Sequence, residues 1–300
     1  MLDPSRRARI PDADIQPIHI DEPTAVRRGS CGERCIREAA AALVQAAEAP
    51  GFKLPMLPET ANEAMSLAAD PNIAMRRLER VIVSDTVLTA RMLTVASSPA
   101  YGGVPLRSLG AALQRLGSGA IRDVLYQSVM ECHMFRGDDE RVARAQREHA
   151  VAVARLSKAI CKVAGIDDGQ AFVTGLLHDI GMLALQALRK LPATAHLGPD
   201  DIQKVEEIVH TTLGARMAAG WKLHPQVIEG IRRHHRYRDY EPGAYSQIGH
   251  VIAVADIIVH HLGLGGTPHP LTDEQHAEIA ALGLDPAQVI AVAGAALLGS

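Results

Sequence analysis

The sequence has 300 residues, and its hydrophobic content of 47% is enough for one large core or two ordinary ones. A formal net charge of −3 gives no global attraction to nucleic acid or to an anionic membrane, and an aromatic content of 3% argues against a stacking surface for single-stranded nucleic acid. Four cysteines are too few for a secreted disulfide framework, no apolar signal segment opens the chain, and its apolar runs are too short to span a bilayer. We therefore expect a cytoplasmic protein with no membrane partner, for which nucleic acid is disfavoured.

The first part of the chain divides into a tail and a helical segment. Residues 1–32 are polar and contain several prolines, which is typical of a tail or linker. From Glu33 onward apolar residues recur every three or four positions among abundant Ala, Leu, Arg and Glu, and no alternating strand pattern occurs. The sequence therefore predicts an all-α protein, a helical bundle. Residues 33–140 are expected to form an N-terminal helical subdomain that acts as a packing or interaction module.

Residues 141–265 differ in chemistry, because histidines and isolated aspartates occur among apolar neighbours. His149 shares a helical stripe with Val153 and Leu156, which places its imidazole on the buried face. His178 and Asp179 adjoin in TGLLHDIGMLAL, and we expect them about 100° apart on one helix.

Three further segments repeat this pattern. His210 shares a face with Leu213 and Met217, and Asp256 lies inside the apolar run HVIAVADIIVHH. His234 and His235 close the helix that begins after Pro225.

Two interpretations of these side chains stay open. Each histidine could be a core residue bonded to a backbone carbonyl. Alternatively, five helices could bring these imidazoles and carboxylates to one point, where they would hold divalent transition ions. A basic run follows the histidine pair, and its guanidinium groups could hold a phosphate by bidentate hydrogen bonds. This run contains Arg232, Arg233, Arg236 and Arg238.

Residues 266–300 are expected to add a C-terminal helical extension. Thr272 is a good cap for a helix over Asp273–Leu282, and a second helix is expected from Pro286, after Asp285. These helices would cover the core or pair with a second subunit in a homodimer.

Taken together, these segments resemble the HDOD domain family, a branch of the HD superfamily found in bacterial signalling proteins. The resemblance covers about residues 50–265. It rests on the opening LPMLPETANEAMSLAADP, the turn SSPAYGG, the segment SLGAALQRLGSGAIRDVL, and the blocks AFVTGLLHDIGMLAL, WKLHPQVIEGIRRHH and VIAVADIIV. It implies an HD-type helical core over 141–265, on which the N-terminal subdomain packs.

The resemblance also implies a ligand set. Catalytic HD proteins use ligands in the order His, His-Asp, Asp, which matches His149, His178, Asp179 and Asp256. Additional ligands of the cyclic-di-GMP phosphodiesterase branch match His210, His234 and His235, with Asp179 as the bridging carboxylate. Many HDOD proteins have lost parts of this set, whereas this sequence keeps every position.

Two departures bear on catalysis. The lysine that follows the His-Asp pair in the phosphodiesterase branch is Met182, and the Gly-Tyr-Pro signature after the histidine pair is absent. Arg232, Arg233 or Arg236 could take over the role of that lysine. The candidate catalytic residues are Asp179, Arg233 and Arg236. A planar guanidinium is not an equivalent point charge, and specificity for cyclic-di-GMP is not expected.

The implied activity is hydrolysis of phosphoesters with one or two ions of Fe, Mn or Zn, which acidify water and polarise a phosphoryl oxygen. The alternative is a non-catalytic regulatory module that binds a protein or ligand and keeps the polar cluster as a relic. The expected partners are signalling proteins or a phosphorylated small molecule or nucleotide.

Overall fold

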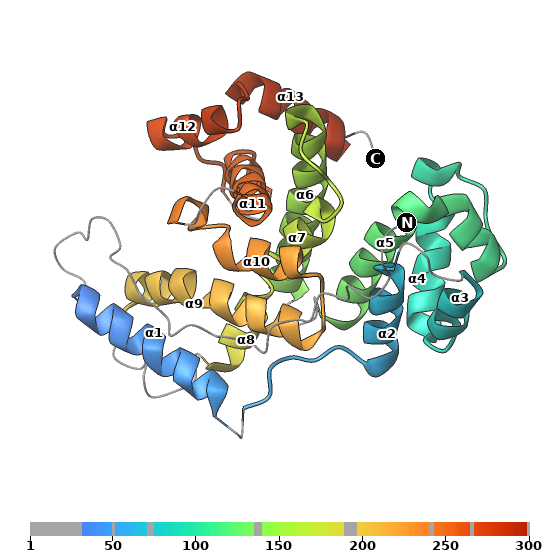
Figure 1. The fold of residues 1–300 in the computed structure, drawn as a ribbon, viewed down its shortest axis with the longest axis horizontal. Coiled ribbons are helices and arrows are strands. Elements are labelled where there is room, and N and C mark those ends of the chain that lie inside the picture. The colour runs from blue at the N-terminus through green and yellow to red at the C-terminus, as the bar shows by residue number, and fades with distance from the viewer. Residues whose placement is uncertain are drawn as a thin grey trace, which may run out of the picture.

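The structure is a computed structural model that describes residues 32–49, 52–70, 75–134, 140–188, 197–239, 243–264 and 267–298. This described part contains thirteen α-helices and no β-strand, which confirms the predicted all-α fold (Figure 1). Residues 1–31 of the predicted tail lie outside the described residues.

Four helices form the group at the right of Figure 1. They are α2 (Glu59–Ala68), α3 (Met75–Val83), α4 (Thr86–Ala96) and α5 (Leu109–His133), with a 3-10 turn, η1 (Pro99–Tyr101), after α4. Their helical stripes bury Met65, Leu78, Ile82 and Met92 completely. The long helix α5 bends at Gly117, whose φ of 67° lies in the left-handed region that glycine adopts without steric cost.

A second group of helices carries the histidine-rich segments. It comprises α6 (Glu140–Ala164), α7 (Ala171–Leu177), α8 (Gly181–Leu188), α9 (Pro199–Gly220), α10 (Pro225–Arg233) and α11 (Ala244–His261), with the 3-10 turn η3 (Tyr237–Asp239) after α10. The helix α6 is packed on both sides. Ala150 and Ala154 join the apolar core shared with α5 and α7, whereas Val153 and Leu156 join a separate core with α11.

The helix α1 (Glu33–Glu48) packs along α9 and α8 rather than on α2–α5, as Figure 1 shows. Its buried stripe includes Ile36 and Leu43, and Glu48 pairs with Arg216 of α9 at 3.0 Å. One apolar core runs through α1–α5 and α7–α10. The predicted subdomain boundaries at 33, 141 and 266 stay predictions.

The two helices expected at the C-terminus are confirmed. The first, α12 (Asp273–Ala281), begins with a capping box in which Thr272 and Gln275 exchange hydrogen bonds, and the second, α13 (Pro286–Leu298), begins at the expected proline. They pack on α11 and α6 and cover the second core with Ile279 and Val289. Among the described residues no single helix is long and apolar enough to cross a membrane. The bent pair α12 and α13 passes that test only when both helices are counted together.

Candidate metal centre

His178 and Asp179 lie in a tight turn between α7 and α8. The expectation that they sit on one continuous helix is wrong, because α7 ends at Leu177 and α8 begins at Gly181. Hydrogen bonds of three-residue spacing close the turn, from the Ile180 N–H to the Leu177 carbonyl at 3.0 Å and from the Met182 N–H to the Asp179 carbonyl at 2.9 Å. At this break, the side chains of His178 and Asp179 face the neighbouring segments.

Glycines bring the helices around this turn into close contact. A Cβ atom on Gly181 would lie 1.9 Å from the backbone oxygen of His210, so only glycine allows α8 to start against α9 at that residue. A Cβ on Gly175 would lie 2.8 Å from Ala154 Cα of α6. On α10, a Cβ on Gly230 would meet the Thr174 side chain of α7 at 2.5 Å. These approaches hold the elements that carry His149, Asp179, His210 and His234 at short range.

Four imidazoles have their Nδ1 atoms turned to backbone carbonyls. His178 Nδ1 lies 2.8 Å from the Gly175 oxygen, His210 Nδ1 lies 2.8 Å from the Glu206 oxygen, and His234 Nδ1 lies 2.7 Å from the Ile231 oxygen. His149 Nδ1 faces the Leu264 oxygen at 3.3 Å. A carbonyl only accepts, so each Nδ1 carries the proton, and the Nε2 atom of each neutral ring presents a lone pair.

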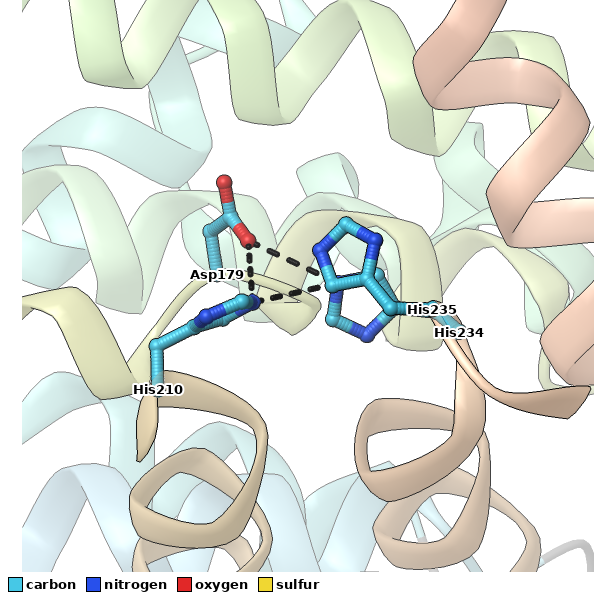
Figure 2. Close-up of side chains that lie close together, drawn as sticks. All are labelled: Asp179, His210, His234 and His235. Atoms are coloured by element: carbon cyan, nitrogen blue, oxygen red, sulfur yellow. Dashed lines mark hydrogen bonds and ion pairs between the residues drawn. The ribbon is translucent and has the colours of Figure 1, made fainter. Parts of the chain in front are cut away.

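Around Asp179, these lone pairs meet a carboxylate (Figure 2). Asp179 Oδ1 lies 3.3 Å from His210 Nε2 and 3.6 Å from His234 Nε2, and the two nitrogens are 3.4 Å apart. His235 brings a fourth donor atom within 4.8 Å of the others. Three elements supply this cluster: the turn after α7, the helix α9 and the end of α10.

Asp256 of α11 forms the second centre. Its Oδ1 lies 3.1 Å from His149 Nε2 and 3.7 Å from His178 Nε2, and these two nitrogens are 3.3 Å apart. His260, one helical turn after Asp256, reaches the same oxygen at 3.4 Å. The two clusters are contiguous, because His178 also lies 3.4 Å from Asp179 Oδ2.

Burial and the two carboxylates act in opposite directions on the charge of the imidazoles. Burial alone would lower the pKa of His178, but the carboxylates of Asp179 and Asp256 raise that pKa well above its usual value. At His234 the effect of burial prevails, and the pKa is lowered. Burial would raise the pKa of Asp179, yet His178, His210 and His234 hold it well below its usual range. Because the Asp179 side chain is 42% exposed, the centre is open to solvent.

The donor set fits a divalent transition ion. Two donors bound at about 2.1 Å to one tetrahedral ion lie about 3.4 Å apart, and the separations of the Nε2 and Oδ1 atoms cluster around this value. The side chains that the sequence proposed as ligands converge here: His149, His178, Asp179, His210, His234, His235 and Asp256. Their role as ligands stays a prediction.

The two candidate arginines pair with acids close to them in the chain. Arg233 contacts Glu229 Oε2 at 2.9 Å, and its guanidinium lies over the Tyr245 ring at 5.7 Å. Arg236 contacts Asp239 at 2.7 Å. Their proposed role in holding a phosphate stays a prediction.

Three of the other histidines among the described residues have partners away from the centre, whereas one further histidine lies beside it. His133 pairs with Asp85 at 3.0 Å, His224 caps α10, and His250 faces the Glu278 carbonyl at 2.9 Å. This further histidine is His260, which is not among the ligands predicted from the sequence. The signal for it is its spacing, four residues after Asp256 on one helical face.

The fold and the centre thus define an all-α protein with a His/Asp cluster that could hold a metal ion. The HDOD domain family matches residues 54–237, more than half of the chain. The chain belongs to the HDOD domain family.

Solved structures share this fold. A candidate metal-dependent phosphohydrolase from Shewanella amazonensis SB2B is 17% identical, with a TM-score of 0.66 over 88% of this chain and 99% of its own. A candidate signal transduction protein from Marinobacter aquaeolei VT8 is 21% identical, with a TM-score of 0.62 over 87% of this chain and 63% of its own. At these identities the likeness shows the fold alone.

A sequence relative adds a second kind of comparison. Ribonuclease Y of Mycoplasma capricolum is 34% identical over 110 residues, which is 37% of this chain and 17% of that protein. The chain spans less than half of the length of the curated relatives it matches.

Proposed function

We propose that this HDOD protein is a metal-dependent phosphoesterase that works in cytoplasmic signal transduction. The observation that carries the proposal is the tautomer pattern. Each of four imidazoles donates its Nδ1 proton to a carbonyl and turns an Nε2 lone pair toward Asp179 or Asp256. Three of these carbonyls lie three or four residues before the histidine, and the orientation they share turns all four Nε2 atoms toward the two carboxylates.

The proposed chemistry assigns a role to each part of the centre. When bound, ions such as Fe, Mn or Zn supply Lewis acidity that acidifies water and stabilises charge on a phosphoryl oxygen. Asp179 would hold ions from both sides, since one carboxylate oxygen faces His210 and the other faces His178. The backbone carbonyls behind the imidazoles fix ring orientation and strengthen the Nε2 atoms as donors.

The substrate class follows from this chemistry. Hydrolysis of a phosphodiester or phosphomonoester suits an open, cationic centre, and the similarity to ribonuclease Y supports the phosphodiester. The proposed partners are signalling proteins and a phosphorylated nucleotide or small molecule.

A second candidate function is a non-catalytic binding module. Two observations favour it: Met182 stands where the phosphodiesterase branch has a lysine, and Arg233 and Arg236 are paired with Glu229 and Asp239. Under this reading the protein acts by binding a partner, and hydrolysis of phosphoesters is absent.

Turnover separates the two functions. The full chain, freed of metal and supplied in turn with Fe(II), Mn(II) or Zn(II), is assayed on a chromogenic phosphodiester and on the matching monoester. We expect turnover with at least one ion, abolished by His178→Ala combined with Asp179→Ala. The matched control combines His276→Ala with Asp273→Ala on the exposed face of α12, and it should keep full activity. No turnover by folded wild type with any of the ions would leave the binding module as the function.

A further inference from the structure

The end of α11 presents three groups to a single histidine. Asp256, His260 and Leu264 follow one another at intervals of four residues, so they lie on one face of the helix and its end. Asp256 Oδ1 is 3.1 Å from His149 Nε2, and the His260 ring centroid is 4.8 Å from that of His149. The Leu264 carbonyl faces His149 Nδ1 at 3.3 Å and fixes its tautomer. The end of α11 therefore both orients His149 and places two donors beside it.

The backbone at the end of α11 is held in place. Gly263 has a φ of 73°, and its N–H bonds the His260 carbonyl at 3.0 Å, while the Leu264 N–H bonds the Val259 carbonyl at 3.1 Å. A Cβ on Gly263 would lie 2.5 Å from Pro268. The position of the Leu264 carbonyl is thus set by the helix termination, not by a free loop.

His260 has the same place in the cluster around Asp256 as His235 has in the cluster around Asp179. In each cluster a carboxylate oxygen is surrounded by buried imidazoles, and one solvent-accessible imidazole completes the ring. The His260 side chain is 53% exposed, whereas His149 and Asp256 are nearly covered. Asp256 Oδ1 is itself buried and has no hydrogen-bond partner of good geometry.

We propose that His260 is a metal ligand: with His149 and Asp256 it forms the outer part of a second cation position, distinct from that of Asp179, His210, His234 and His235. The His260 Nε2 to Asp256 Oδ1 distance of 3.4 Å equals the separation of about 3.4 Å expected for two donors on one tetrahedral ion. Donors at i and i+4 on one helical face are a recurrent arrangement for transition ions. The ligand class is a borderline divalent ion such as Zn(II), Mn(II) or Fe(II).

This inference deepens the proposed function and rests on one part of it, the binding of a divalent ion at the centre. It does not require that the protein hydrolyse a phosphoester. The test counts ions on the full chain without substrate, by titrating metal-free protein with Co(II) and measuring bound cobalt and its absorption. Wild type is expected to bind two ions. His260→Ala should retain the first and weaken the second about 10–100-fold or more, because even indirect partners of ligands have effects of that size.

Three further variants separate ligation from packing. His260→Phe keeps the ring beside His149 without a donor, and it should lose the second ion as His260→Ala does. His260→Cys should restore the second ion and add thiolate-to-cobalt charge-transfer absorption. His261→Ala, which removes the neighbouring ring bonded to the His269 carbonyl, should titrate like wild type.

The proposal is overturned if wild type binds fewer than two ions. It is also overturned if His260→Ala and His260→Phe bind two ions with wild-type affinity, or if the His260→Cys variant shows no charge-transfer band. A protein that binds two ions in this way but hydrolyses no phosphoester would refute the proposed function and leave the role of His260 intact.

Discussion

Asp179 faces imidazoles from three segments through its two carboxylate oxygens, and its side chain adds little to the apolar core because it is 42% exposed. We predict that Asp179→Asn lowers affinity for Mn(II) or Zn(II) at least about hundredfold, since loss of a direct ligand exceeds the roughly 10–100-fold effect of losing an indirect one. Isothermal titration of metal-free protein measures the affinity, and circular dichroism checks that helix content is kept.

Asp239→Asn is the matched control for this prediction. It also removes an aspartate carboxylate, but one that is exposed and paired with Arg236 at 2.7 Å. Its metal affinity should equal that of wild type. If both variants bind metal equally well, Asp179 is not a ligand.

Arg233 tests whether the basic run after α10 serves the substrate. We predict that Arg233→Ala raises KM for the phosphodiester at least about tenfold, the effect of losing about 1.4 kcal/mol of binding to a phosphate oxygen. Metal content should stay unchanged, because Arg233 pairs with Glu229, which is not a candidate ligand.

Arg232→Ala serves as the comparison, since Arg232 pairs with the same Glu229 through its other oxygen at 3.2 Å. Steady-state kinetics of both variants give the answer. An equal change in KM for the two would mean that Glu229, and with it the end of α10, had moved. No change for either would remove Arg233 from the candidate catalytic residues.

At the scale of elements, the close approach of α8 to α9 positions Asp179 against His210. A Cβ on Gly181 would lie 1.9 Å from the His210 oxygen and 2.6 Å from the Gly214 nitrogen, both of them backbone atoms that cannot rotate away. We predict that Gly181→Ala lowers the free energy of unfolding by about 3 kcal/mol, at the upper end of overpacking costs, and weakens metal binding as the helices separate. Chemical denaturation and metal titration measure the two effects.

Gly220→Ala controls for the change of residue type. Gly220 ends the same helix, α9, and a Cβ there would meet nothing within 4 Å. This variant should keep metal affinity and gain up to about 1 kcal/mol of stability, because alanine favours the helix over glycine. A Gly181→Ala protein as stable as wild type would show that α8 and α9 are not held as closely as the structure has them.

The sequence predicts the helices well because their signals are local. Thr272 and Gln275 form a capping box, Pro286 opens α13, and apolar spacing marks the buried stripe of α6. The break at His178–Asp179 could not be predicted in this way, because TGLLHDIGMLAL has continuous helical spacing and the turn depends on how closely Gly181 meets α9.

The site shows the same division between local and tertiary information. Placement of His149 and His210 on buried faces follows from their apolar neighbours. The Glu206 carbonyl that orients His210 lies four residues earlier on the same helix, so helical periodicity predicts it as a partner. The Leu264 carbonyl that orients His149 comes from a distant part of the chain and follows only from the tertiary fold. The spacing of His260 from Asp256 is visible in the sequence, but spacing alone does not show that its ring lies beside that of His149.

At the scale of the whole molecule, the centre lies where two apolar cores meet. One core runs through α1–α5 and α7–α10, and the other joins α11, α12 and α13, while α6 contributes to both. The ligand candidates come from both sides of this boundary. An ion bound between Asp179 and Asp256 would therefore tie the turn after α7 to α11. Since unfolding separates these donors, binding energy at the centre adds directly to the stability of the folded chain.

We predict that Zn(II) or Mn(II) at a hundredfold excess over its dissociation constant stabilises the chain by about 2.7 kcal/mol for each site. This corresponds to a rise of about 5 °C in Tm for a chain of this size. Scanning calorimetry with and without a chelator measures the shift. Mg(II) should produce little, because it prefers oxygen ligands to imidazole. The variant with His178→Ala and Asp179→Ala should show a smaller shift, because it loses the position around Asp179 but keeps His149, Asp256 and His260. A shift equal to that of wild type would place the bound ion elsewhere on the chain.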